Sequence, residues 1–495
     1  MSDVGIAWLF FVGYLTIIGA AATVGIRRMK GLGDFAVGDR KVSPLFVGLS
    51  LAANLTSAAT FIVNPGLLYL SGVSGFLGYA IATPLGIMVG LTVLSKAFRR
   101  VGDRYSALTV PQWIGDRYGS WVLKTLFAGI SLLLITFLIL IVVGLTLVLS
   151  SVLGLPEWAA MAITIAVPLV YIMLGGASAH TLTSTVQAAV MLIVAVLLIG
   201  SGIAYFSDGL GGFLDRLAAI DPLLAAPVNP KSPLFRSAFE VFVANFVIGL
   251  AVVTQPHIIS KALYLRTERD VNTYLATGFA VLIVFFCVLV VGLYARLLFP
   301  AGDLAPDRVV PTYLVDVFSP GVRGLVAMGL VAAGFSTLEG LLLALSAIFA
   351  NDIYGAWARR HSSLSEEERS VRAVRYGKLF MVALVPVLAL ASWQQIQSPN
   401  LSVAILAQNG VYALFSATFA PILFGIFADR MPAWGAGAAA LSALIVHFGM
   451  YYGQIGPYWN NPAVPATFAL ATSVLVAGVA LVLTRPAPVP TAVQP

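Results

Sequence analysis

The chain alternates long apolar runs with short polar connections. Thirteen runs are long enough to cross a bilayer, because a helix needs about 20 apolar residues to span the hydrocarbon core. The pattern predicts an all-α polytopic membrane protein with about 13 transmembrane helices, which we number as spans one to thirteen. The runs lie at about 4–26, 44–71, 73–95, 122–150, 157–176, 179–206, 236–260, 271–299, 321–350, 376–394, 403–427, 435–455 and 464–484.

Two spans are interrupted by polar residues and proline. Span two contains Asn54-Leu55-Thr56-Ser57 and then Asn64-Pro65-Gly66, and span seven contains Thr254-Gln255-Pro256-His257. Proline removes a backbone donor, and polar clusters at membrane depth are tolerated only around a cavity. The alternative is a simple proline kink in each span. The two spans lie five apart and so cross in opposite directions, which predicts that spans two to six and seven to eleven are inverted repeats opening with broken helices.

Composition and charge support the membrane assignment. The chain is 59% hydrophobic and 10% charged, with a mean hydropathy of +0.95, which excludes a soluble globular protein of this size. We place 22 of the 28 Lys and Arg residues on the side of the membrane that follows the odd-numbered spans. By the positive-inside rule the N-terminus is outside and the C-terminus cytoplasmic. The net charge of +7 therefore reflects topology in the bilayer, and we expect no nucleic-acid partner.

The sequence predicts a single membrane domain without enzyme motifs. Residues 1–485 form this domain, with a core of spans two to eleven at about 44–427, peripheral spans one, twelve and thirteen, and a disordered tail at 486–495. Cys287 is the single cysteine, and the four histidines are too scattered for a zinc motif. We find no Walker loop, dinucleotide fingerprint or nucleophile elbow. We expect a retained first span, no enzymatic activity and no obligate protein partner.

The segment with the clearest chemistry lies in span nine. Ser336 and Thr337 offer two adjacent hydroxyl oxygens, and the carbonyl of Ala333 one turn earlier has a spare lone pair. Hard oxygen ligands of this kind suit a small cation such as Na⁺. The alternative is that both hydroxyls bond back to their own helix, as Ser and Thr often do in membranes.

Several motifs, in order along the chain, resemble the sodium:solute symporter family, particularly its proline, pantothenate and acetate permease branch. The sequence Gln255-Pro256-His257-Ile258 is shared with the small-carboxylate branch, whereas sugar carriers differ there. The resemblance covers about residues 5–450. Its motifs are 34–40 (DFAVGDR), 109–118 (TVPQWIGDRY), 175–176 (GG) with 183–187 (TSTVQ), 255–258 (QPHI), 336–339 (STLE) and 351–354 (NDIY).

This resemblance implies the leucine-transporter-type fold, a 5+5 inverted repeat in spans two to eleven. In that fold Na⁺ lies between the break of span two and span nine. Carried over to this sequence, its ligands are the carbonyls of Ala53, Thr56 and Ala333 and the hydroxyls of Ser336 and Thr337. An alternative gap in span two would move the first pair to Ala52 and Leu55.

The chain departs from the family pattern at two carboxylates. Leu55 stands where the proline carriers have Asp, and Ser184 stands where the span-six signature has Asp. These changes put a second Na⁺ site in question. They leave Glu339, one turn from Ser336, as the main carboxylate near the cation site, and so as a candidate coupling residue. The alternative is a structural, hydrogen-bonded carboxylate.

Polar side chains near the two breaks could converge on a solute cavity. Half-helix N-termini favour a carboxylate there, and no Arg or Lys falls at these positions. Amides on membrane spans also serve as helix contacts, which is the alternative. Ala58 and Ala59 replace the sugar carriers' acidic and amide pair, which disfavours a sugar. The candidate substrate residues are Asn54, Ser57, Thr60, Gln255, His257, Gln408 and Asn409.

These features predict a Na⁺-coupled symporter in the plasma membrane that imports a small organic carboxylate or amino acid by alternating access. Proton coupling through Glu339 is one alternative. A non-transporting membrane sensor is another, and it is disfavoured because no cytoplasmic signalling domain follows span thirteen in this sequence.

Overall fold

The computed structural model describes residues 2–27, 31–38, 42–398 and 402–484, and every regular element in those ranges is a helix. The predicted all-α class is therefore confirmed. The predicted tail at 486–495 lies outside the described residues. Five of the Lys and Arg residues counted for the orientation also lie outside the described residues, and one of them is the last residue of the 34–40 motif. They are Arg28, Lys30, Arg40, Lys41 and Arg485.

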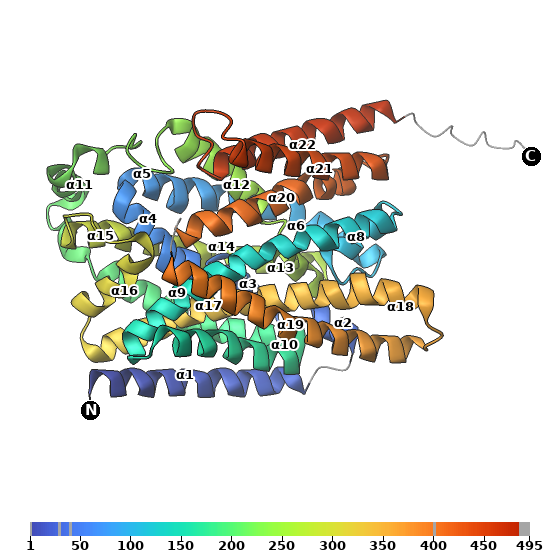
Figure 1. Ribbon diagram of the computed structural model, residues 1–495, viewed down its shortest axis with the longest axis horizontal. Helices are drawn as coiled ribbons and strands as arrows, with labels where there is room; N and C mark the ends of the chain where they lie inside the picture. Colours follow the sequence, from blue (N-terminus) through green and yellow to red (C-terminus); the bar gives the residue numbers. More distant parts are fainter. Residues whose placement is uncertain (1, 28–30, 39–41, 399–401, 485–495) are drawn as a thin grey trace, which may run out of the picture.

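Ten helical stretches in the described residues are long and apolar enough to cross a membrane. In Figure 1, α1 lies along one edge of the molecule, α21 and α22 lie along the opposite edge, and α9 and α17 lie between them. The stretches are α1 (Asp3–Ile26), α5 (Val73–Phe76) with η2 (Leu77–Ala82) and α6 (Thr83–Arg104), α8 (Trp121–Ile130) with η3 (Ser131–Leu134) and α9 (Ile135–Leu153), α10 (Glu157–Gly200), α14 (Glu268–Cys287) with η8 (Val288–Val290) and α15 (Val291–Leu298), α17 (Pro320–Ile348) with η9 (Phe349–Tyr354) and α18 (Gly355–His361), α19 (Glu366–Gln397), α20 (Val403–Phe427), α21 (Ala433–Tyr452), and α22 (Ala463–Leu483).

Both predicted interruptions coincide with bends. Span two consists of α3 (Pro44–Leu55), then η1 (Ala59–Val63) and α4 (Asn64–Ser71), with a 49° bend between the halves. Span seven consists of η6 (Phe239–Ala244) and α12 (Asn245–Val252), then α13 (Pro256–Ile259) and η7 (Ser260–Tyr264), with a 58° bend. The second half of span seven begins at Pro256, which has no backbone N–H to continue the preceding helix.

The long helix α10 contains two antiparallel segments. Tyr171 and Gln187 both donate a hydrogen bond to Oε1 of Glu339, although a straight helix would hold positions 16 residues apart about 24 Å from each other. The chain reverses at Gly176, whose φ of 54° and ψ of −144° are not helical. A Cβ there would lie 2.9 Å from the Phe35 backbone. The segments 157–175 and 177–200 correspond to predicted spans five and six.

The total of thirteen spans stays a prediction, because length and composition qualify ten helices directly and up to twelve with the bent pairs among the described residues. The remaining elements are short connections outside these stretches. They are α2 (Leu32–Val37), α7 (Val110–Arg117), η4 (Ile203–Phe206), α11 (Gly209–Ile220), η5 (Pro222–Leu224) and α16 (Pro306–Val317).

Helix packing follows a two-fold pattern. In span two α3 packs on α14 of span eight, while in span seven α12 packs on α6 of span three. Likewise α9 of span four packs on α20 of span eleven, while α17 of span nine packs on α10, which holds span six. If each span is exchanged with the span five places away, the contact of spans two and eight becomes that of spans seven and three. In the same way, the contact of spans four and eleven becomes that of spans nine and six. This is the packing expected of a five-plus-five repeat.

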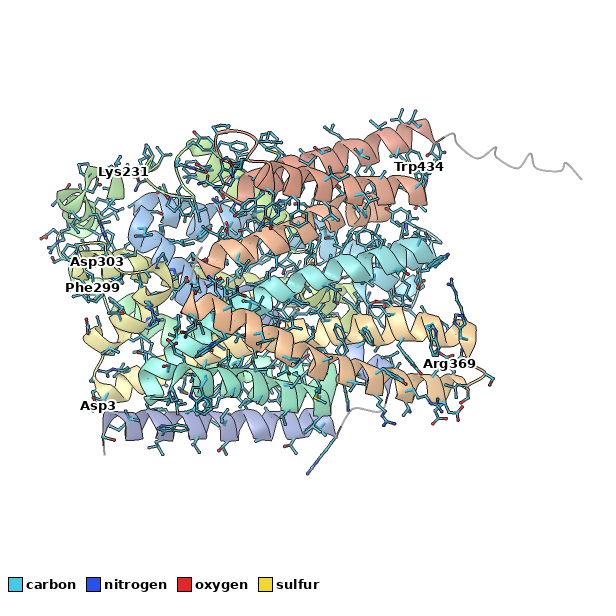
Figure 2. The ribbon with its side chains drawn as sticks, viewed as in Figure 1. Asp3, Lys231, Phe299, Asp303, Arg369 and Trp434 are labelled. Atoms are coloured by element: carbon cyan, nitrogen blue, oxygen red, sulfur yellow. The ribbon has the colours of Figure 1, made fainter. Side chains whose placement is uncertain are left out.

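The polar connections lie at the two ends of the helices. Figure 2 shows Asp3, Lys231 and Asp303 at one end and Arg369 at the other. The connections predicted to share a side with the N-terminus therefore do lie together. Which end faces the cytoplasm stays a prediction.

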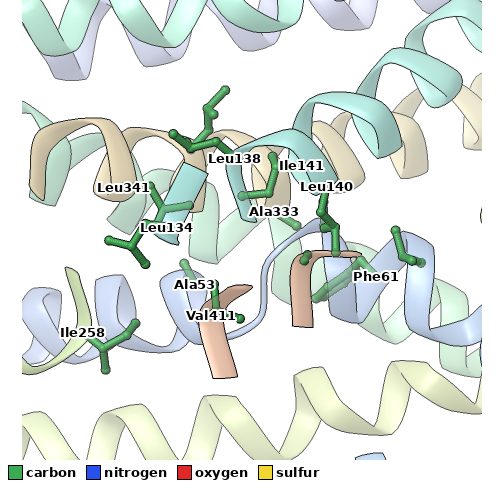
Figure 3. Close-up of a cluster of buried hydrophobic side chains, with 14 of the residues drawn as sticks. Ala53, Phe61, Leu134, Leu138, Leu140, Ile141, Ile258, Ala333, Leu341 and Val411 are labelled. Atoms are coloured by element: carbon green, nitrogen blue, oxygen red, sulfur yellow. The ribbon is translucent and has the colours of Figure 1, made fainter. Parts of the chain in front are cut away.

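The centre of the bundle is apolar and closely packed. We compare the most apolar 18-residue window of each stretch. In the stretch that contains α17, 94% of this window is buried, whereas the value is 28% for α1 and 33% for both α21 and α22. The outer helices expose large apolar side chains such as Leu390 and Val482, as lipid-facing helices do. Figure 3 shows Ala53, Phe61, Leu138 and Ala333 packed around the break of span two. The polar groups in this interior therefore need specific partners.

Candidate functional site

Oxygen atoms of α3 and α17 meet where α3 ends at the break of span two. The Ser336 hydroxyl oxygen lies 3.1 Å from the Ala53 carbonyl oxygen and 2.9 Å from that of Ala333. The Thr337 hydroxyl oxygen lies 3.3 Å from the Asn54 carbonyl oxygen and 3.5 Å from that of Ala333. All five residues are buried. Because the last carbonyls of a helix lack intrahelical donors, the break makes those of Ala53 and Asn54 available.

The chemistry of this oxygen cluster fits a small hard cation. The atoms that meet are carbonyl and hydroxyl oxygens, which are the hard ligands that such cations prefer. Ser336 and Thr337 also bond back to Ala333, but a hydroxyl that donates its proton keeps lone pairs for a cation. Asn54 contributes its backbone carbonyl to this cluster, whereas its side-chain Oδ1 lies beside Gly340. Binding a cation would give these oxygens the positive partner that the apolar surroundings lack.

The structure brings four of the five predicted cation ligands together. Ala53, Ala333, Ser336 and Thr337 come together, but the carbonyl that faces Thr337 belongs to Asn54. The hydroxyl and the N–H of Thr56 both donate to the Ala52 carbonyl, at 2.5 and 3.1 Å, and so close the last turn of α3. The Thr56 carbonyl as a cation ligand, and the alternative pair of Ala52 and Leu55, stay predictions.

A cavity of about 700 Å³ lies beside the two breaks. It combines polar side chains with aromatic walls, including Phe137, Phe286 and Phe415, and no charged side chain of the described residues lines it. Four of the seven predicted substrate residues lie on it: Ser57, Thr60, Gln255 and Gln408. The Oε1 atom of Gln255 is buried without a partner in the described part of the chain, so this cavity offers a free acceptor to a solute.

The other three predicted substrate residues do not line this central cavity. Asn54 donates to the Ser50 carbonyl at 2.8 Å, and its Oδ1 lies so close to Gly340 that a Cβ there would clash with it. His257 lines a second cavity. Asn409 faces α21, where its carbonyl and side-chain oxygens each lie 2.9 Å from Nε2 of His447. Gln408 therefore faces the central cavity, whereas the side chain of its neighbour Asn409 faces α21.

Three polar residues on the cavity were not among the predicted substrate residues. Asn64 belongs to the Asn-Pro-Gly sequence that marked the break of span two, and that signal could have identified it. Tyr412 lies four residues after Gln408 and so shares its helix face. Thr83 in span three carries no comparable signal.

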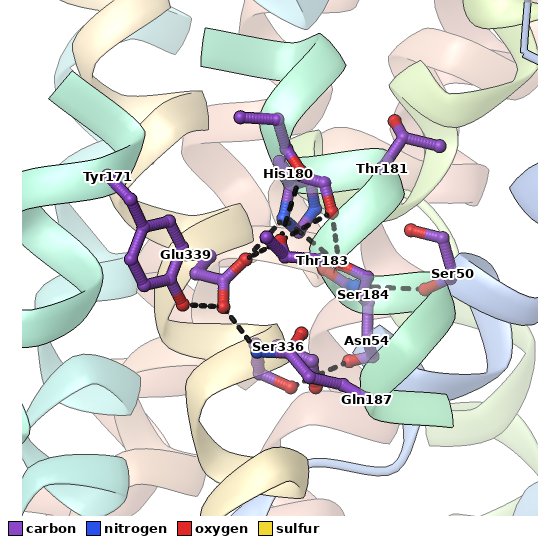
Figure 4. Close-up of polar contacts among 12 residues, drawn as sticks. Ser50, Asn54, Tyr171, His180, Thr181, Thr183, Ser184, Gln187, Ser336 and Glu339 are labelled. Atoms are coloured by element: carbon purple, nitrogen blue, oxygen red, sulfur yellow. Dashed lines mark hydrogen bonds and ion pairs between the residues drawn. The ribbon is translucent and has the colours of Figure 1, made fainter. Parts of the chain in front are cut away.

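Glu339 lies in a network of buried hydrogen bonds with α10 (Figure 4). Its Oε1 accepts from the Tyr171 hydroxyl and, at 2.5 Å, from Nε2 of Gln187. Its Oε2 accepts from the Thr183 hydroxyl at 2.7 Å and lies 3.3 Å from Nδ1 of His180. Four neighbours therefore satisfy the carboxylate, as the structural alternative required, and all four belong to spans five and six. The position of Ser184, four residues after His180, places its hydroxyl 3.1 Å from the same Nδ1.

A buried lysine completes this network. Lys261 directly follows predicted span seven, which ends at about residue 260, and so is predicted to lie in the connection after it, but the structure buries it in η7. Its Nζ lies 2.7 Å from the Ser50 hydroxyl and 3.2 Å from Nε2 of His180. Because the Lys261 ammonium can only donate, Nε2 of His180 is the acceptor in this contact. The proton of the neutral ring is therefore on Nδ1, which donates to Glu339. His180 thus bridges a buried ammonium and a buried carboxylate. No local signal in the sequence indicates this bridge, because it depends on contacts between distant helices.

Solved structures resemble this chain along nearly its whole length. The substrate-bound, outward-open state of a Na⁺-coupled sialic acid symporter matches with a TM-score of 0.79 and 17% identity, over 97% of this chain and 98% of that chain. A nucleobase-cation-symport-1 family transporter in a closed conformation matches with a TM-score of 0.55 and 14% identity, over 91% and 94%. Both are transporters of the leucine-transporter fold, so that fold is confirmed, whereas the broken helices in spans two and seven stay a prediction.

Sequence relatives are transporters rather than enzymes, as predicted. The sodium/pantothenate symporter of Haemophilus influenzae is 27% identical over 449 residues, which cover 88% of each chain. The sodium/proline symporter of Escherichia coli is 28% identical over 449 residues, 87% of this chain and 85% of the relative. A sequence model of the sodium:solute symporter family matches residues 35–445. The chain therefore belongs to the sodium:solute symporter family of multi-pass membrane transporters.

Proposed function

We propose that this protein is a Na⁺-coupled symporter that imports a small organic carboxylate or amino acid across the plasma membrane by alternating access. The observation that carries the proposal is the position of one broken segment. Ala53 and Asn54 present carbonyls to Ser336 and Thr337, while Ser57 and Thr60 of the same segment line the central cavity. A cation bound to the carbonyls would fix the geometry of the residues that meet the solute. Na⁺ would drive transport through its different affinity for the two access states.

The chemistry of the cavity supports a small polar solute. The unpartnered Gln255 oxygen requires an N–H or O–H donor from the solute. Because the described residues place no charged side chain on the cavity wall, backbone N–H groups at the breaks would hold a carboxylate. Proline and pantothenate, which the named relatives carry with sodium, both have a carboxylate and a donor. They are the first solutes to test.

Uptake into proteoliposomes tests this function. We expect radiolabelled L-proline or pantothenate to accumulate under an inward Na⁺ gradient and to equilibrate without accumulation when K⁺ replaces Na⁺. Uptake should need Na⁺ at two external pH values, one mildly acidic and one mildly alkaline. Accumulation driven by a pH gradient without Na⁺ would instead establish proton coupling, and no uptake of either solute would contradict the proposed solute class.

The neighbours Gln408 and Asn409 provide a matched pair of variants. We expect Gln408→Ala to raise the half-saturating solute concentration about tenfold, because one hydrogen bond to the solute is lost. Asn409→Ala should change that concentration much less, but it should lower the thermal unfolding midpoint, since His447 would lose the side-chain oxygen that faces its Nε2. Equal effects of the two variants on uptake would contradict the assignment of their faces.

A further inference from the structure

A second, smaller cavity lies beside the break of span seven. Its walls come from α2, from residues 108–110, from α10, from α13 and η7, and from α17. Small residues of α17, namely Gly340, Ala344 and Ala347, leave the space open. The connections that hold α2 and residues 108–110 are those predicted to be cytoplasmic. Two residues of one break therefore face two cavities, because Gln255 lines the central cavity and His257 lines this one.

Of the polar side chains on the second cavity, only His257 has no hydrogen-bond partner among the described residues. Thr109 donates to Asp352 at 2.6 Å, Ser260 donates to the Pro256 carbonyl, and Tyr264 reaches the Ala36 carbonyl at 3.5 Å. His180 lies between Lys261 and Glu339. His257 is 5% exposed, and neither of its ring nitrogens is bonded within the part of the chain that the structure describes.

The chemistry of His257 defines what would satisfy it. A neutral imidazole has one N–H donor and one acceptor nitrogen. A ligand that satisfies both must therefore present an acceptor and a donor close together, as an amino acid, a hydroxy acid or an amide does.

We propose that this cavity is a second solute site, centred on His257, which holds the transported solute on the cytoplasmic side after it leaves the central cavity. The inference rests on the proposed function, since it assigns the same solute class to both cavities. Passage from one to the other requires movement past Pro256, the point at which span seven is bent. The solute would exchange the Gln255 oxygen for the His257 ring.

Cysteine protection tests the site directly. The single cysteine is removed by Cys287→Ser, and Ser260→Cys then places a thiol on the second cavity. Inside-out membrane vesicles are labelled with a maleimide without Na⁺, in the presence of increasing L-proline or pantothenate. We expect the solute to protect the introduced thiol, and His257→Leu to raise the protecting concentration about tenfold or more. His257→Gln keeps a donor and an acceptor, so protection should need nearly the same concentration as with His257.

Variants and uptake assays separate this site from the proposed function. Gln255→Ala should impair Na⁺-driven uptake and leave protection of the introduced thiol unchanged, because it alters the central cavity alone. Ala344→Phe, which fills the second cavity without removing His257, should abolish protection. If protection fails with both solutes, or is unchanged in His257→Leu, the cavity holds water only and the site is overturned. Protection without any Na⁺-driven uptake would support the site and contradict the proposed function.

Discussion

Replacing Ser336 or Thr337 with alanine is expected to raise the Na⁺ concentration for half-maximal uptake about tenfold or more. Each hydroxyl supplies one oxygen to the cluster at the end of α3. Losing one hydrogen-bonding or coordinating partner of a charge costs about 1.5–3 kcal/mol, which is equivalent to about one to two decades of affinity. The measurement is initial uptake as a function of Na⁺ at saturating solute.

Ser346 provides a matched control for these two variants. It lies on the same helix α17, is buried, and its hydroxyl has no hydrogen-bond partner among the described residues. Ser346→Ala should therefore leave the Na⁺ dependence unchanged while making the same chemical deletion. Unchanged Na⁺ dependence in both Ser336→Ala and Thr337→Ala, with normal expression, would remove the cluster from the cation site.

The sequence predicted the apolar helices and the positions of the two bends well, because both depend on local properties. Apolar run length defines a membrane helix, and proline with polar neighbours defines a break. The Gly175-Gly176 pair is part of a family motif, and the structure shows that α10 reverses at Gly176. The reversal requires a positive φ, which glycine adopts readily. Local signals of this kind can be recognised in the sequence without knowledge of the tertiary structure.

The direction of side chains could not be predicted in the same way. Gln408 and Asn409 are equally polar and adjacent, but one faces the cavity and the other faces His447. Gln255 and His257 face different cavities because the backbone bends between them. The sequence places Lys261 among the basic residues after span seven, but in the folded protein it is buried beside His180. Each of these outcomes depends on the rotation of a helix against its neighbours, and a hydrophobicity pattern does not fix that rotation.

Glu339 combines the two alternatives that the sequence left open. Its carboxylate is fully hydrogen-bonded to spans five and six, as a structural group would be. It also lies one turn from Ser336 and is connected through His180 to the Lys261 ammonium. Breaking a buried ionic arrangement by removing one partner costs about 3–5 kcal/mol, because the remaining charge is left uncompensated. The two charges should therefore act on stability and on Na⁺ affinity as a pair.

We expect Glu339→Gln and Lys261→Met to have opposite effects on Na⁺ affinity. Without the Glu339 charge, the Lys261 ammonium repels a cation at the neighbouring cluster, so the half-maximal Na⁺ concentration should rise. Without the Lys261 charge, the Glu339 carboxylate attracts that cation more strongly, so the concentration should fall. The double variant should lie near the wild type. Changes of the same sign in the two single variants would show that the effects are not electrostatic.

Stability provides the second readout of the pair, because the hydrogen bonds of His180 limit what Glu339→Gln can tolerate. A glutamine amide could still accept from Tyr171 and Gln187, but its NH₂ would face Nδ1 of His180, which carries the proton. Turning the imidazole to the other tautomer would then set an N–H against the Lys261 ammonium.

Each single variant should therefore lower the thermal unfolding midpoint in detergent, and Lys261→Met should restore part of it in the Glu339→Gln background. A double-mutant cycle should give a coupling free energy of about 0.5–3 kcal/mol. Additive losses would mean that His180 does not connect the two charges.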